Sequence, residues 1–122
     1  MAEEEAFIGI RIDEGAAGEI GSFREDEIHF IDMWVPKKNY QVPRFYTDQG
    51  VFTVILTLDA CKKAFTTLSS FDSGIIGNYN KISHVVDNGY GLVAHFEGSE
   101  HTAILAKNKR RLVKNLIKKG RK

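Results

Sequence analysis

Residues 42–56 are VPRFYTDQGVFTVIL, two runs of mainly β-branched and aromatic residues separated by Asp48-Gln49-Gly50. Residues of these types favour strands, and the glycine stands where a three-residue hairpin loop requires a left-handed backbone. The stretch therefore predicts a β-hairpin with strands over residues 42–47 and 51–56. A hairpin near the middle of the chain favours a mostly β protein.

The chain before this hairpin also has strand character. Residues 7–12 alternate well enough for a first strand, and residues 28–35 form another candidate that ends at Pro36. Between them, the glycine-rich residues 15–21 predict a loop or an irregular connection. A polar loop at residues 36–41, PKKNYQ, joins the second candidate to the hairpin and carries both cations and amides.

Helical spacing replaces alternation directly after the hairpin. From Thr57 to Leu68 apolar residues recur at helical intervals, which predicts one short internal helix with Thr57 as its N-cap. Cys61 lies on that apolar stripe, so we expect a buried structural thiol. Because it is the single cysteine of the chain, neither an intrachain disulfide nor a cysteine-based zinc site can form.

The second half of the chain returns to strand patterns. Residues 69–77 are polar and contain glycines, which predicts a loop or a brief strand. Three strands are then expected, the last two as a hairpin, over residues 82–86, 90–96 and 101–106. No linker or internal repeat divides the sequence, so we expect one domain over residues 1–122.

Charge is segregated along the chain. Residues 105–122 contain nine Lys or Arg and no acid, and residues 1–30 contain nine acids, although the formal net charge is only +1. An amphipathic C-terminal helix is expected, with residues 119–122 as a mobile basic tail. Its apolar stripe is Leu112, Val113, Leu116 and Ile117, and its basic face is Lys107, Arg110, Arg111, Lys114 and Lys118. Such a face can dock on a polyanion.

Several classes of protein are not supported by the sequence. The uncharged apolar runs are too short to cross a bilayer, and the chain opens with Met1, Ala2 and three glutamates rather than a secretory leader. We therefore expect a cytoplasmic protein without membrane association. The spacing of His29, His84, His95 and His101 does not fit a metal site, and no nucleophile elbow is present. Enzyme activity and a cofactor are not expected.

Two cationic patches make nucleic acid the leading candidate partner. The loop at Lys37–Gln41 and the C-terminal basic face each combine charge for phosphates with amides able to pair with adenine edges. A competing interpretation comes from residues 72–77, DSGIIG, which partly resemble the Asp-x-Ser-x-x-Gly motif of PilZ domains. Those domains bind cyclic di-GMP, but Gly74 replaces the serine and their upstream Arg-x-x-x-Arg motif is missing.

Motifs spread along the chain resemble those of LytTR-type domains, the DNA-binding modules of LytR/AlgR-type response regulators in bacteria. Residues 26–32, 45–52 and 57–59 resemble the family's strand ending in an acid, its T-x-D-G type hairpin and its Leu-led helix. Residues 78–82 with Val85 resemble the V-N-x-x-x-I segment. Ala106-Lys107-Asn108 resembles the V-S-R segment that opens the last helix.

The resemblance implies a mostly β fold, with elongated antiparallel β-sheets, one short internal helix and a C-terminal helix. It also implies a transcription regulator that binds double-stranded DNA by inserting loops into successive major grooves. Lys107 takes the place of the family's arginine. The expected DNA-binding residues are Lys37, Lys38, Asn39, Gln41, Ser73, Lys107, Asn108, Arg110, Arg111 and Lys114.

The chain departs from the family pattern between Phe71 and Gly77. The family usually carries a His-Arg-Ser or His-Asn-Ser contact segment there, whereas this chain has Asp72-Ser73-Gly74. An alternative is therefore a LytTR-like protein-interaction module that has lost DNA binding. For the DNA-binding form, the expected partners are double-stranded DNA, a second copy of the chain on paired half-sites, and a separate signalling protein.

Overall fold

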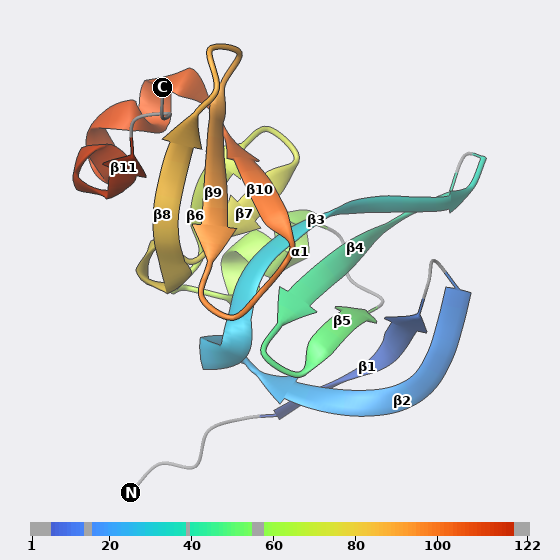
Figure 1. Ribbon diagram of the computed structural model, residues 1–122. Helices are drawn as coiled ribbons and strands as arrows, with labels where there is room; N and C mark the ends of the chain where they lie inside the picture. The colour runs from blue at the N-terminus through green and yellow to red at the C-terminus, as the bar shows by residue number, and fades with distance from the viewer. Residues whose placement is uncertain (1–5, 14–15, 39, 55–57, 119–122) are drawn as a thin grey trace, which may run out of the picture.

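The computed structural model describes residues 6–13, 16–38, 40–54 and 58–118. A seven-stranded sheet forms the central layer (Figure 1). A four-stranded sheet packs on one of its faces, and α1 (Leu58–Ala64) packs on the other. Strands dominate the described chain, so the mostly β class expected from the sequence is confirmed.

The large sheet has the strand order β2-β1-β5-β4-β3-β7-β6, with antiparallel neighbours throughout. Its strands are β1 (Ala6–Asp13), β2 (Ala16–Arg24), β3 (Ile28–Lys37), β4 (Tyr40–Thr47), β5 (Gly50–Thr53), β6 (Ser69–Asp72) and β7 (Ile75–Gly77). The small sheet has the order β10-β9-β8-β11, in which β11 runs parallel to β8. Its strands are β8 (Ile82–Asp87), β9 (Leu92–Phe96), β10 (Thr102–Leu105) and β11 (Ile117–Lys118).

The central hairpin is confirmed as β4 and β5. Thr47 pairs with Gly50, so the loop between the strands has two residues rather than the three expected. Gly50 has a φ of +123°, which explains why a glycine stands there even though it begins the strand. The expected β5 extended to residue 56, but β5 ends at Thr53 and residues 55–57 lie outside the described part.

β2 occupies residues that the glycines predicted to be a loop, so that prediction is wrong. Gly21 on β2 pairs with Gly9 on β1, and both glycines lie against buried Phe52 of β5. A Cβ atom at Gly21 would lie 2.6 Å from the Phe52 ring. Here glycine allows a close approach inside a sheet, a role that composition alone does not distinguish from a turn.

Two hydrophobic cores lie on opposite faces of the large sheet. Alternation along β3 and β4 directs Phe30 and Tyr46 toward the small sheet, and Ile31 and Phe45 toward α1. The core on the small-sheet side also contains Phe71, Ile82, Val85, Leu92, Phe96, Leu105 and Val113. The core on the α1 side also contains Phe23, Ile28, Phe52, Cys61, Phe65 and Leu68. The large sheet is thus buried on both faces over much of its width.

α1 is shorter than the helix expected over residues 57–68, and the expected N-cap, Thr57, lies outside the described residues. Cys61 is fully buried in the core beside the large sheet. Burial raises the pKa of its thiol to about 11, so the thiol stays protonated at neutral pH. The expectation of a buried structural thiol is confirmed.

The C-terminal helix differs from the regular amphipathic helix expected. The segment η3 (Lys107–Leu116) is a 3₁₀ helix that kinks at Val113, where φ is −120° and ψ is 15°. The expected apolar stripe is therefore broken: Val113 is buried, but Leu112 is 65% exposed and Ile117 belongs to β11.

Tertiary contacts at both ends of η3 account for this difference. The Ala106 N–H donates to the Phe71 carbonyl at 2.7 Å, and Ile117 pairs with Val85. The two ends of η3 are held by β6 and β8, which lie far from it in the sequence. The spacing of apolar residues within η3 therefore does not determine its backbone path. Residues 119–122, the expected mobile tail, lie outside the described residues.

Strand pairing extends beyond the elements expected in the second half of the chain. Residues 69–77 form the β6–β7 hairpin, and β8, β9 and β10 confirm the three strands expected after it.

At the opposite end of the large sheet, Ile8 and Ile20 on the β1–β2 hairpin are 70% and 76% exposed. No helix in the described part of the chain is long and apolar enough to span a membrane.

Candidate nucleic-acid interface

The start of η3 is held against the end of β6. The hydrogen bond from Ala106 to the Phe71 carbonyl places Lys107 close to the turn that carries Asp72 and Ser73. Ser73 is exposed and Asp72 is half-buried. The structure therefore brings together two of the three segments expected to contact DNA, although they are 34 residues apart in the sequence.

The side chains of η3 form a basic surface. An open hollow of about 820 Å³ runs along this segment. The expected contact residues on η3 are all exposed, and they are Lys107, Asn108, Arg110, Arg111 and Lys114. Exposed cations and an exposed amide on one short segment can meet phosphates and base edges.

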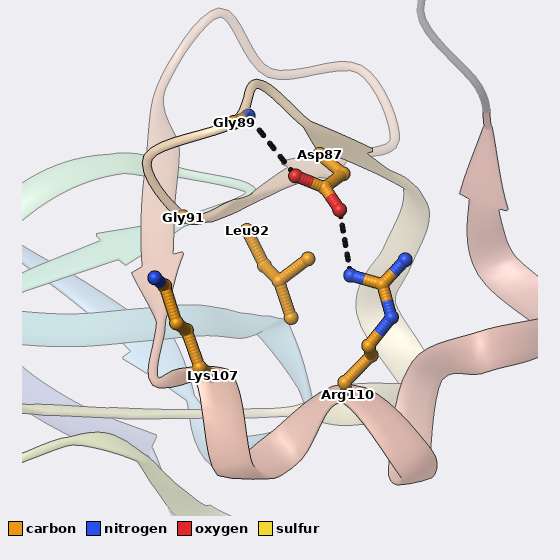
Figure 2. Close-up of a pocket in the computed structure, with 6 residues that line it drawn as sticks. All are labelled: Asp87, Gly89, Gly91, Leu92, Lys107 and Arg110. Atoms are coloured by element: carbon orange, nitrogen blue, oxygen red, sulfur yellow. Dashed lines mark hydrogen bonds and ion pairs between the residues drawn. The ribbon is translucent and has the colours of Figure 1, made fainter.

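Arg110 is not free within this surface. Its Nη1 donates to Oδ2 of Asp87, the last residue of β8, at 2.6 Å (Figure 2). The Arg110 hydrogen bond, helped by one from the Gly89 N–H, holds the pKa of Asp87 below its ordinary value. The carboxylate thus remains ionised and paired, and part of the positive charge counted from the sequence is already neutralised.

The third expected segment lies at the tip of the long β3–β4 hairpin. We call this whole hairpin the arm. Lys37 pairs with Tyr40, so residues 36, 37, 40 and 41 of the expected loop belong to the paired strands β3 and β4. Lys38 and Gln41 are exposed, Lys37 ends β3, and Asn39 lies outside the described residues. Figure 1 shows the arm extending away from the small sheet and η3, so the structure does not group it with Lys107.

An ion pair braces the arm on the side of the large sheet that faces the small sheet. Arg44 Nε and Nη2 donate to the two carboxylate oxygens of Asp32 at 3.0 and 3.1 Å, and the Tyr46 hydroxyl donates to Asp32 Oδ2 at 3.2 Å. Burial, followed by the charge of Asp32, raises the pKa of Tyr46, which keeps its hydroxyl protonated as a donor. These bonds join the neighbouring strands β3 and β4 through their side chains.

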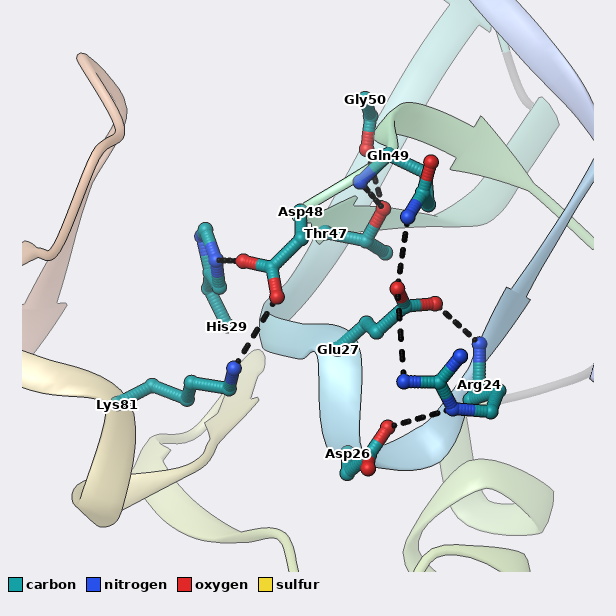
Figure 3. A network of polar contacts seen from close by, with 9 residues as sticks. All are labelled: Arg24, Asp26, Glu27, His29, Thr47, Asp48, Gln49, Gly50 and Lys81. Atoms are coloured by element: carbon teal, nitrogen blue, oxygen red, sulfur yellow. Dashed lines mark hydrogen bonds and ion pairs between the residues drawn. The ribbon is translucent and has the colours of Figure 1, made fainter. Parts of the chain in front are cut away.

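A second polar network joins the β4–β5 turn to two other connections (Figure 3). His29 Nε2 donates to Asp48 Oδ1 at 2.6 Å, and Lys81, in η2 (Tyr79–Lys81), donates to Asp48 Oδ2 at 3.2 Å. Gln49 donates to Glu27, in η1 (Glu25–Glu27), at 2.7 Å. Burial alone would raise the pKa of Asp48, but the hydrogen bonds from His29 and Lys81 outweigh it and lower the pKa.

Sequence reasoning missed this network, because residues 19 to 33 positions apart show no common spacing. His29 is 3% exposed and stacks on Phe96, with ring centroids 5.5 Å apart. It is therefore a structural histidine at the junction of the two sheets. His84 and His95 stack across β8 and β9, and no group of three metal-binding side chains occurs among the residues that the structure describes.

The arrangement defines a two-sheet β domain with a basic C-terminal segment and projecting hairpins. The LytTr DNA-binding domain of a Bacillus cereus protein has a similar solved structure, with a TM-score of 0.64 and 8% sequence identity. The match covers 94% of this chain and 97% of that chain. No protein-family model and no curated protein matches the sequence. The structural likeness confirms the LytTR-like fold that the sequence motifs predicted.

Proposed function

We propose that the protein is a transcription regulator that binds double-stranded DNA sequence-specifically, contacting major grooves through its projecting segments. One observation carries the proposal: a row of exposed cations and an amide on η3, beside the Ser73 turn, on a fold like that of a LytTr DNA-binding domain. Positive charge supplies affinity for phosphates, and amide and amine groups can distinguish base edges in the major groove.

Within this proposal the contact residues have two roles. The base readers are Lys107 and Asn108 at the start of η3, with Asn39 and Gln41 at the arm. The groups that hold the backbone and fix orientation are Lys37, Lys38, Ser73, Arg110, Arg111 and Lys114. Separate contact points on one rigid domain would set the register of the protein on the duplex.

The proposed setting is the cytoplasm of a bacterium, where the protein acts without a cofactor. A second copy would bind the other of two paired half-sites, because symmetric sites are the usual way for a small domain to gain affinity and specificity. A separate signalling protein would control its activity.

The first test is the salt dependence of binding, measured by fluorescence anisotropy with a labelled duplex of random sequence. Five phosphate contacts predict that log K falls against log salt with a slope of about −4 to −5. An Arg111→Ala, Lys114→Ala double variant removes two exposed cations from η3, so its slope is expected to be shallower by about 2. A Lys62→Ala, Lys63→Ala double variant, altered on exposed positions of α1, is the matched control and should keep the wild-type slope.

Three results would contradict this proposal, in whole or in its assignment of η3. An affinity that does not depend on salt would show that phosphates are not the partner. No binding of duplex even at low salt would favour the alternative, in which the basic surface meets an acidic protein. If both double variants lower the slope equally, then binding occurs but η3 is not its main site.

A further inference from the structure

The turn between β8 and β9 presents an aromatic side chain to solvent. Tyr90 is 92% exposed, the highest exposure among the large apolar and aromatic residues that the structure describes as exposed. Its ring contributes to neither of the two hydrophobic cores. A fully exposed aromatic ring is therefore available for contact with a partner.

Hydrogen bonds within the turn hold its backbone. Asn88 Oδ1 accepts from the N–H groups of Tyr90 and Gly91 at 2.9 and 3.0 Å, and Asp87 Oδ1 accepts from Gly89 at 3.0 Å. Gly89 has a φ of +89°, a conformation suited to glycine. Because these amides are already bonded inside the turn, the groups that the turn offers to a partner are exposed side chains, among them the phenol of Tyr90.

The turn lies beside the start of η3. A hollow of about 350 Å³ between them is lined by Gly89, Gly91 and Lys107, among other residues (Figure 2). The Ser73 turn is attached to the same end of η3 through Ala106 and Phe71. Lys107 therefore lies between two projecting turns, one carrying Ser73 and the other carrying Tyr90.

Charge does not prevent this turn from approaching a phosphate. Asp87 is the acid nearest to the tip in sequence, and its carboxylate is paired with Arg110 at 2.6 Å. A neutral hydroxyl can donate to a phosphate oxygen, and a ring can pack on a deoxyribose, without any requirement for base sequence. The phenol of Tyr90 thus fits the sugar–phosphate backbone.

We propose that the β8–β9 turn is a further DNA-binding site, in which the Tyr90 hydroxyl donates to a phosphate and its ring packs on the neighbouring sugar. The site lies next to the base pair that Lys107 approaches. This inference rests on the proposed DNA-binding function and adds a contact that none of the cationic segments supplies.

The test compares Tyr90→Ala and Tyr90→Phe with the wild-type chain in anisotropy titrations at several salt concentrations. Tyr90→Ala is expected to weaken binding about fivefold on every sequence, and Tyr90→Phe about twofold, because the first loses ring and hydroxyl and the second only the hydroxyl. The salt slope should stay at the wild-type value, since no cation is removed. Ile20→Ala, at another highly exposed site, on β2, is the control and should bind as the wild type does.

The outcomes separate this inference from the function on which it rests. If the wild-type chain binds duplex and Tyr90→Ala binds equally well, then the Tyr90 site is wrong and the proposed function stands. If Tyr90→Ala also makes the salt slope shallower, as loss of a cation does, then its effect comes from a disturbed Arg110 and the direct contact is wrong. If the wild-type chain does not bind duplex, then both proposals fail together.

Discussion

Lys107 and Arg111 lie four residues apart on η3 and are both exposed, but their surroundings differ. Lys107 stands at the first position of the segment, between the Ser73 turn and the β8–β9 turn. Both residues line the open hollow along η3, but Lys107 also lines the hollow beside the β8–β9 turn, whereas Arg111 does not. The position of Lys107 beside two turns suits a base contact, whereas Arg111, which lines the open hollow along η3, suits phosphates along the backbone.

Single alanine variants should separate these two roles. Lys107→Ala is expected to relax preference at one base pair, at a cost of about 1–3 kcal/mol on the specific site and little on random duplex. Arg111→Ala should weaken specific and random sequences alike and make the salt slope shallower by about 1. Competition titrations with both kinds of duplex provide the measurement. Equal losses on both duplexes for Lys107→Ala would assign that residue to the backbone instead.

The set of exposed cations on η3 could be predicted from the sequence, but their partners could not. Runs of Lys and Arg remain at the surface because burying an unpaired charge is costly, so exposure follows from composition. The pairing of Arg110 with Asp87 joins residues 23 positions apart and depends on how β8 lies against η3. The His29–Asp48 bond was missed for the same reason, because it depends on strand register.

At the scale of elements, strands were predictable where side chains alternate. The prediction failed where glycine has a packing role. The β4–β5 hairpin, β1 and β3 follow from alternation and turn residues. The expectation for residues 15–21 failed because Gly21 was interpreted as a loop residue, whereas it gives Phe52 room inside the sheet. Gly21 is therefore a site at which the addition of a single methyl group should lower the stability of the fold.

Gly21→Ala is expected to lower the free energy of unfolding by about 1–3 kcal/mol. The new Cβ would lie 2.6 Å from the Phe52 ring, which is fully buried and cannot move aside easily. Gly74→Ala is the matched control, because no atom lies within 4 Å of a Cβ at that position. Urea denaturation followed by circular dichroism measures both variants. A Gly21→Ala chain as stable as the control would show that β1, β2 and β5 are packed less closely than described.

At the scale of the whole molecule, the expected contact residues fall into two groups. One group is at the start of η3 with the Ser73 turn, and the other is at the tip of the arm, which points away from the small sheet (Figure 1). The sequence motifs predicted the LytTR-like fold that holds both groups. They did not predict the spatial relation between the groups, because it depends on the direction of the arm and on the tertiary contacts of η3.

Hydroxyl-radical footprinting should show two protected stretches in each half-site, separated by about one helical turn. Lys38→Ala with Gln41→Ala is expected to remove protection in one stretch, and Lys107→Ala with Arg111→Ala in the other. A selected binding site and the wild-type chain provide the reference pattern. One continuous stretch that weakens equally in both variants would mean that the arm and η3 do not occupy separate grooves.

The arm also carries the single tryptophan of the chain, Trp34, which is half-buried and pairs with Val42 across the two strands. Indole emission from the unmodified protein therefore comes from the arm alone, with no label and no substitution. Excitation at wavelengths that tyrosine does not absorb would report the arm's surroundings separately from those of η3. Docking of the arm could then be timed optically in stopped flow, independently of the overall affinity that a labelled duplex reports.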